Sequence, residues 1–149
     1  MNDPTLASKA NAPWHLWLVG VLALLWNSVG AFDYVMTQSR NASYMRAFAS
    51  KQLTYYADLP MWVVSTWALS VWGGVLGSAL LLLRRRLAVP AFSVSLITFL
   101  VTSFHTYILA DGFAILGGAG ALVFTAIIFV IAVGLLIYAR LLTRRGVLR

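Results

Sequence analysis

The sequence predicts an all-α membrane protein in which four transmembrane helices form a bundle, and three observations support this prediction. The chain of 149 residues is 61% hydrophobic and only 10% charged, whereas soluble domains carry roughly 25% charged residues. Four apolar runs reach about 20 residues, the length that crosses a bilayer core. Basic residues stand at the ends of these runs, since a cation at the bilayer centre is costly. We therefore expect one membrane domain, residues 1–149, and exclude a water-soluble fold.

The first half of the chain is expected to hold one crossing and one surface segment. Residues 1–12 are polar and should form a surface tail. The first crossing is predicted over residues 14–33, starting at interfacial tryptophans; a cleavable signal peptide is the alternative interpretation. Residues 34–59 form the longest polar segment. A short amphipathic helix over residues 41–56, capped by Asn41 or Ser39, would explain it, and so would a surface loop packed over the bundle.

The second half predicts three further crossings joined by short turns. They cover residues 61–83, residues 90–110 after the turn at Arg84, Arg85 and Arg86, and residues 113–139. The fourth crossing could start slightly later than Phe113, because several glycines follow that residue.

The basic residues predict the orientation. Eight of the eleven, counting Lys9, fall on the side that holds both termini and the triple arginine, and only Arg40, Arg46 and Lys51 fall on the other. Because cytoplasmic loops carry the excess of Lys and Arg, both termini are expected in the cytoplasm. The formal net charge of +7 is thus explained by topology and by contacts with membrane lipid, and we expect no nucleic-acid partner.

Small residues predict how the helices pack, because lipid gives helices no hydrophobic reason to associate and close packing must do so. They form stripes on the first, second and fourth crossings. Intrachain packing is the favoured interpretation, and a dimer interface or a flexing point is the alternative. The residues concerned are Gly30, Ser70, Gly73, Gly74, Gly77, Ser78 and Gly118.

Polar residues at similar depth on three crossings predict a pocket that opens outward beneath residues 34–59. His105 lies six residues before Asp111, about 9 Å into its helix, and its neutral-range pKa would make it the proton-switchable group. Interhelical hydrogen bonding is the equally weighted alternative. The candidate pocket residues are Asn27, Asp33, Ser65, Thr66, Thr102, His105 and Asp111; Tyr34, Tyr44, Tyr55 and Tyr56 are assigned to the interfacial belt, with ring stacking on a ligand as the alternative.

No catalytic or metal site is predicted. The chain has no cysteine, two histidines and four acidic residues, and it has none of the common nucleophile, zinc, phosphate-loop or haem motifs. A cofactor cannot be specified from these residues.

Two motif groups carry a resemblance to known proteins. The segments WNSVGAFDYVMTQ and PMWVVSTWALSVWGGVLGSALLLLRRRLAVPAFSVSL resemble a group of small four-helix bacterial membrane proteins without an assigned activity, often labelled "sugar transporter". The layout is also similar to DoxX-like proteins, some of which are linked to quinone-coupled redox chemistry, but residues 68–74 lack the acidic residue usual there. The resemblance implies a bacterial inner membrane.

The sequence favours a non-enzymatic accessory or interaction subunit that packs against partner helices or lipid, as a homo-oligomer or within a larger complex. Small-residue stripes without catalytic groups are the reason. A small-solute transporter acting as a homo-oligomer and a quinone-linked redox protein are the alternatives.

Overall fold

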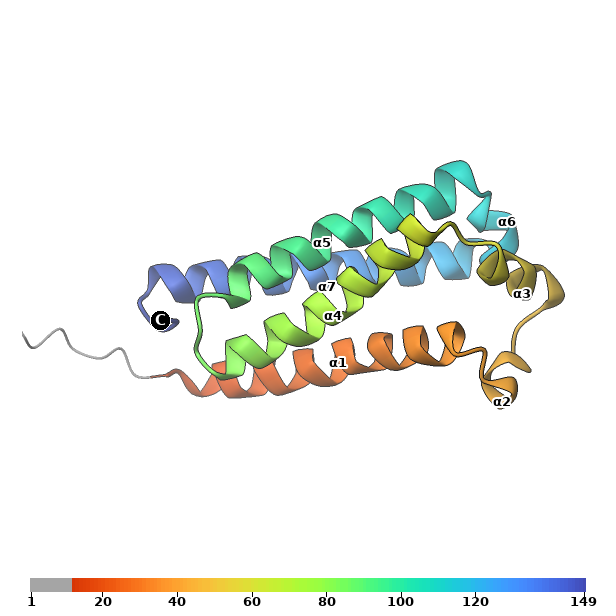
Figure 1. Ribbon diagram of the computed structural model, residues 1–149. Helices are drawn as coiled ribbons and strands as arrows, with labels where there is room; N and C mark the ends of the chain where they lie inside the picture. The colour runs from red at the N-terminus through yellow and green to blue at the C-terminus, as the bar shows by residue number, and fades with distance from the viewer. Residues whose placement is uncertain (1–11) are drawn as a thin grey trace, which may run out of the picture.

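Four long helices run side by side along the molecule, and three shorter segments cover one of its ends (Figure 1). The computed structural model describes residues 12–149, so the polar tail predicted for residues 1–12 lies outside the described residues except for its last position. The long helices are α1 (Trp14–Gln38), α4 (Met61–Leu82), α5 (Ala88–Phe104) and α7 (Ala119–Arg144). A π-helical segment, η1 (His105–Leu109), extends α5. All four spans are long and apolar enough to cross a membrane, which confirms the predicted four-helix membrane fold.

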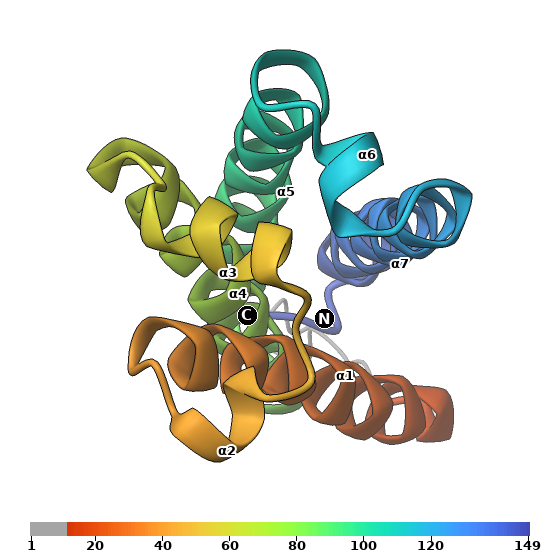
Figure 2. The same cartoon turned by 90° about the vertical axis from the view of Figure 1, so that its right-hand side faces the viewer.

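The spans follow the order α1, α4, α5, α7 around the bundle (Figure 2). Helix α4 packs against both α1 and α5, and α5 packs against α7. The two outer helices, α1 and α7, have few contacts with each other. The bundle is therefore closed on three sides and loosely closed on the fourth.

The helix boundaries differ from the predicted ones where local backbone geometry overrides hydropathy. Helix α1 continues to Gln38, because no helix breaker follows Asp33, and the chain turns at Arg40 with φ 51°. Helix α5 begins at Ala88, so Pro90 lies within its first turn, where its missing N–H has no partner to lose. Helix α7 begins at Ala119 rather than near Phe113.

Two glycines cause that later start. Gly117 and Gly118 have φ values of 115° and 64°, which separate the short helix α6 (Gly112–Leu116) from α7. Asp111 also has a positive φ, 50°, at the turn after η1. Gly118, assigned from the sequence to helix packing, is thus a turn residue: it precedes α7, and a Cβ there would meet only the Phe113 ring.

The polar segment forms two short helices instead of one. These are α2 (Ala42–Met45) and α3 (Ser50–Ala57). The side chain of Asn41 caps α2 by accepting a hydrogen bond from the Tyr44 N–H at 3.1 Å, as the sequence predicts for this residue type. Helix α3 lies across the end of the bundle (Figure 2). We call residues 41–59 the roof.

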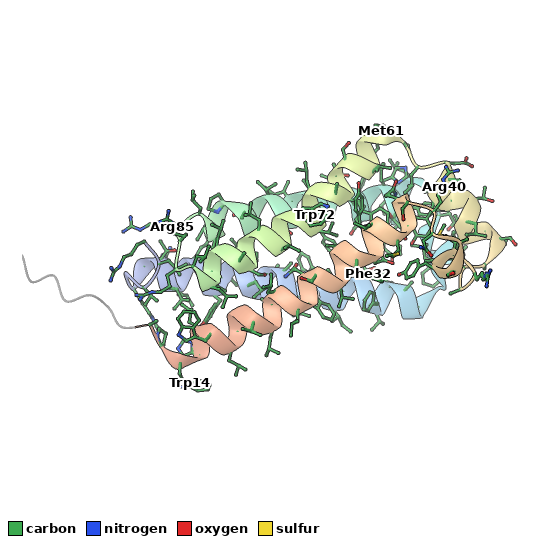
Figure 3. The ribbon with its side chains drawn as sticks, turned by 60° about the horizontal axis from the view of Figure 1, so that its bottom comes forward. Trp14, Phe32, Arg40, Met61, Trp72 and Arg85 are labelled. Atoms are coloured by element: carbon green, nitrogen blue, oxygen red, sulfur yellow. The ribbon has the colours of Figure 1, made fainter. Side chains whose placement is uncertain are left out.

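The end opposite the roof, which we call the arginine end, consists of residues 82–88 and 140–149. Figure 3 shows Trp14 and Arg85 at this end and Arg40 and Met61 at the roof end. After Gly146 the chain folds back so that Val147 and Leu148 are buried. Backbone hydrogen bonds from Arg149 N to Arg84 O (2.8 Å) and from Arg86 N to Arg149 O (2.9 Å) fasten these residues to the α4–α5 turn.

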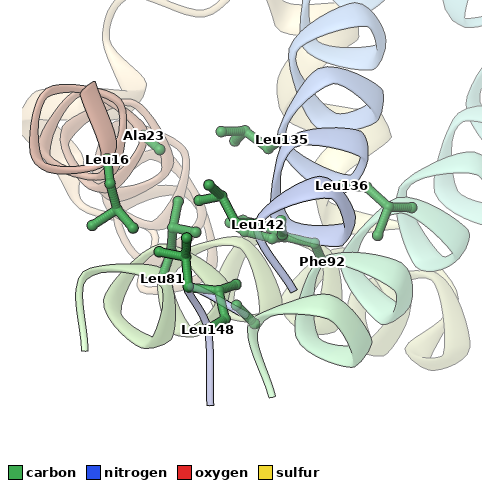
Figure 4. Packing of buried hydrophobic residues seen from close by; sticks show 11 residues of the cluster. Leu16, Ala23, Leu81, Phe92, Leu135, Leu136, Leu142 and Leu148 are labelled. Carbon is green, nitrogen blue, oxygen red and sulfur yellow. The ribbon is translucent and has the colours of Figure 1, made fainter. Parts of the chain in front are cut away.

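The hydrophobic core gathers toward the arginine end (Figure 4). Leu16 from α1, Leu81 from α4, Phe92 from α5 and Leu142 from α7 meet there, together with Leu148. The opposite half of the bundle is hollow, and it contains the candidate site.

Candidate ligand-binding cavity

A cavity of about 550 Å³ lies between the four spans on the roof side of the core. Residues 26–33 of α1, 63–71 of α4, 95–107 of α5 and η1, and 121–135 of α7 contribute its walls. Tyr44, Tyr55, Tyr56 and Leu59 of the roof close its end. Ligand pockets in proteins are commonly of this size.

Aromatic rings attach the roof to α4. Tyr56 stacks on Trp67 with ring centroids 5.8 Å apart, and Tyr34 of α1 meets the same Trp67 edge-on at 5.1 Å. Tyr55 and Tyr56 are themselves 5.3 Å apart. These side chains, assigned from the sequence to an interfacial belt, thus pack against one another at the end of the cavity.

Two hydrogen bonds attach the roof to the other walls. The Tyr44 hydroxyl donates to Asp33 Oδ1 of α1 at 2.5 Å, and the Tyr55 hydroxyl and Thr106 Oγ1 of η1 are 2.9 Å apart. The bond to Asp33, helped by burial, raises the pKa of Tyr44 to about 12. Burial raises the pKa of Tyr55 and, more strongly, that of Tyr56. The three phenols are therefore neutral near pH 7 and act as hydrogen-bonding groups.

Below the roof, the cavity wall carries a band of hydroxyl groups. Thr102, Ser103 and Thr106 line it from α5 and η1. The Tyr107 hydroxyl lies 2.8 Å from Thr125 Oγ1, which joins η1 to α7. The hydroxyl groups of Thr102, Thr106 and Thr125 also donate hydrogen bonds to backbone carbonyls of their own helices.

The deep part of the cavity is mainly apolar. Val71, Phe99, Ile128, Ile131 and Leu135 line it, and Leu135 also belongs to the hydrophobic core. Its polar lining residues are Asn27, Ser70 and Ser95. The cavity thus changes from mainly hydrogen-bonding groups beneath the roof to a mainly apolar lining near the core. This gradient fits a molecule with a polar head and an apolar body.

The cavity opens sideways between α1 and α7. Val29 and Phe124 both line it, yet 67% and 56% of their surfaces are exposed on the side of the bundle. The Trp26 and Phe124 rings approach across this gap, with centroids 6.3 Å apart. In a membrane this side faces the acyl chains.

The structure brings together only some of the candidate pocket residues. Asn27, Asp33 and Thr102 line the cavity. Thr66 lies behind the wall, where it accepts a hydrogen bond from Thr102 at 2.9 Å. Ser65 is exposed and bonds to the Met61 carbonyl of its own helix.

His105 and Asp111 take other positions than expected. His105 is buried against the Trp62 ring, with centroids 5.3 Å apart, and does not line the cavity. His105 follows Thr102 by three residues, so its side chain is rotated about 60° from that of Thr102 around the helix axis, toward α4. Thr106 follows Thr102 by four residues, which brings its side chain onto the cavity side. Asp111 is exposed in the turn before α6. The group expected to switch the pocket therefore lies outside the cavity.

The small residues of α4 pack against neighbours within the chain. A Cβ on Gly74 would overlap the Asn27 amide of α1, and one on Gly77 would lie 2.7 Å from the Phe92 ring of α5. Gly73 also faces α5, at Ser95, whose hydroxyl donates to the Ser70 carbonyl at 2.6 Å. The Asn27 amide donates to Ser78 Oγ at 3.2 Å, and Gly30 faces Val71. Both small-residue faces of α4 are occupied by α1 and α5.

Sequence reasoning missed the residues that shape the cavity beneath the roof: Ser103, Thr106, Tyr107 and Thr125, and the side opening at Trp26 and Phe124. The spacing of Thr102, Ser103, Thr106 and Tyr107 was the available signal, since these residues share one helical face.

The chain is thus a multi-pass, four-helix membrane protein with a roofed cavity that opens to the side. The described residues contain no group of three or more His, Cys, Asp or Glu that could hold a metal ion. No protein-family model, curated protein or solved structure matches this chain.

Proposed function

We propose that this protein is a non-enzymatic membrane protein that binds a small amphiphilic molecule taken up from the bilayer. The cavity carries the proposal: it has about 550 Å³ of space, hydroxyl groups beneath the roof, an apolar floor and an opening toward lipid. A non-catalytic role is supported by the composition of the lining, in which no histidine, cysteine, lysine or arginine takes part. One carboxylate and neutral phenols make no acid–base pair tuned for chemistry.

The membrane and the orientation belong to the same proposal. We place the protein in a bacterial inner membrane with both termini in the cytoplasm and the roof outside. The orientation is supported by the uneven distribution of basic residues, which are more numerous at the arginine end than at the roof end, where there are three. With this orientation, the ligand head lies near the outer headgroup region.

A role as an accessory subunit is the second candidate. Since α1 and α5 fill the small-residue faces of α4, a second copy or a partner would pack on α7, which is the least buried of the four spans. Gly120 and Gly134 on α7 face open space, which would let another helix approach closely.

Native mass spectrometry of the protein released from its own membrane tests both candidates. We compare the wild-type chain with Ala132→Phe, which fills the deep part of the cavity, and with Ala126→Phe, which adds the same ring to an exposed position on the same helix. The wild type and Ala126→Phe should retain a small-molecule adduct, and Ala132→Phe should lose it.

Each other outcome has a definite meaning. An adduct-free wild type, or an adduct that persists in Ala132→Phe, contradicts the ligand-binding proposal. A second protein at fixed stoichiometry, with no small molecule, makes the accessory role the better one. A retained quinone would favour the redox alternative, and ligand-dependent solute uptake by reconstituted vesicles would favour the transporter alternative.

A further inference from the structure

Among residues 12–149, Asp33 is the one residue with a formal charge that lines the cavity. It lies five residues before the end of α1, inside the span rather than at its end, and it is only partly exposed. Its Oδ1 accepts the hydrogen bond from the Tyr44 hydroxyl. A carboxylate is stabilised by a cation close to it.

The basic residues at this end of the protein do not supply that cation to the cavity. Arg40, Arg46 and Lys51 are exposed, and none of them lines the cavity. The space beside Asp33 is therefore negatively charged. It disfavours the head of an anionic lipid or a fatty acid by like-charge repulsion and favours a positive group.

Aromatic rings surround the same part of the cavity. Tyr44, Tyr55 and Tyr56 of the roof and Trp67 of α4 all line it. Contacts between rings, including the stacked pair Tyr56–Trp67, hold these side chains in place. Aromatic faces attract cations electrostatically, and the attraction is larger where water is excluded.

Building on the proposed function, we infer that the ligand is an amphiphilic organic cation. Its positive head lies beside Asp33 beneath the roof rings, and its apolar groups occupy the space toward Phe99 and Leu135. A carboxylate and aromatic rings at one end of a cavity with a mainly apolar floor match such a molecule in both charge and polarity. The side opening admits it from the bilayer, where amphiphilic cations accumulate.

Two probe ions of nearly the same shape and opposite charge test the inference. Tetraphenylphosphonium and tetraphenylborate are titrated separately into the full chain in lipid nanodiscs, and binding to protein-free nanodiscs is subtracted. The wild-type protein should bind the phosphonium ion saturably and the borate ion not at all above the lipid background. Asp33→Asn removes the charge but keeps an oxygen for Tyr44, and should weaken phosphonium binding about tenfold or more.

Four further variants make the result specific. Asp111→Asn removes the same charge from an exposed turn at the same end and should leave phosphonium binding unchanged. Ala132→Phe should abolish phosphonium binding and Ala126→Phe should not. Tyr56→Leu keeps Asp33 and removes one ring, and should weaken binding several-fold.

The inference is overturned if the wild type binds borate as well as phosphonium, or if Asp33→Asn binds phosphonium as tightly as Asp111→Asn. If Ala132→Phe nevertheless loses its native adduct, the cavity binds a ligand that is not a cation, and the proposed function stands without this inference. If Ala132→Phe has no effect on any ligand, both fail. Should Asp33→Asn not fold, the discrimination between the two probe ions by the wild type decides the question.

Discussion

Helices α1 and α7 meet at the arginine end and part at the roof end, and this contrast divides the molecule into a packed half and a hollow half. At the arginine end, His15 Nδ1 lies 2.6 Å from the Tyr138 hydroxyl, and Leu16 and Leu142 belong to one core. Toward the roof end, the Trp26 and Phe124 rings approach across the gap with centroids 6.3 Å apart. The same four helices therefore make a rigid base and an open site.

The two ends are also closed by different forces. The C-terminal residues close the arginine end through backbone hydrogen bonds and the burial of Leu148. The roof is held by side chains: two hydrogen bonds from tyrosine hydroxyls and a group of ring contacts. The backbone hydrogen bonds and the buried leucine together resist opening of the arginine end. The side-chain contacts of the roof are each worth about 1 kcal/mol and can break one at a time.

The largest difference between the ends is expected for leucine truncation. Leu148→Ala removes a fully buried side chain from the arginine end and should lower the free energy of unfolding by about 3 kcal/mol. Leu59→Ala, in the roof, borders an existing cavity and should lower it by about 1 kcal/mol or less. Reversible unfolding in mixed micelles measures both; equal losses would mean that the roof end is packed as tightly as the arginine end.

Replacing a glycine by alanine should also affect the two halves differently, but with a smaller difference in the free energy of unfolding. Gly77→Ala places a Cβ 2.7 Å from the Phe92 ring in the core and should destabilise the protein by about 2 kcal/mol. Gly30 lines the cavity, and a Cβ at this position would have the Val71 side chain as its nearest neighbour, at 3.7 Å. Gly30→Ala should be tolerated with a change of about 0.5 kcal/mol at most. A Gly30→Ala protein as unstable as Gly77→Ala would contradict a hollow roof end.

The smallest effect is expected from pH, and it concerns the roof alone. Because Asp33 accepts its hydrogen bond, Tyr44 has a pKa raised from 10.0 to about 12. A raised pKa means that the bond stabilises the roof fully below pH 10 and that this stabilisation is lost as the pH rises through about 12. Asp33→Asn should move the Tyr44 titration back toward 10.

Ultraviolet absorbance of the phenolate measures this titration, and Tyr44→Phe identifies the signal that belongs to Tyr44. Asp111→Asn is the matched control and should leave the titration of Tyr44 in place. A Tyr44 signal that does not move in Asp33→Asn would mean that the hydrogen bond does not hold the roof to α1.

Local properties of the sequence were enough to determine the spans and the character of the two ends. Hydropathy and length specified four crossings, arginines marked one end, and Asn41 or Ser39 was expected as a helix cap, of which Asn41 caps α2. Small residues on α4 could be recognised as packing positions, because close packing supplies much of the force that brings helices together in lipid. Which neighbours they meet could not be read from spacing.

Only the tertiary structure decided where the space lies and which residues face it. The positive φ angles at Gly117 and Gly118 set the start of α7, and the divergence of α1 from α7 opened the cavity beside Asp33 rather than beside His105. Helical periodicity gives the angle between residues of one helix and carries no information on the rotation of that helix against its neighbours. That rotation arises from the sum of all interhelical contacts, which is why a polar residue at the right depth, His105, ended outside the cavity and an aspartate near the end of a span came to lie in its wall.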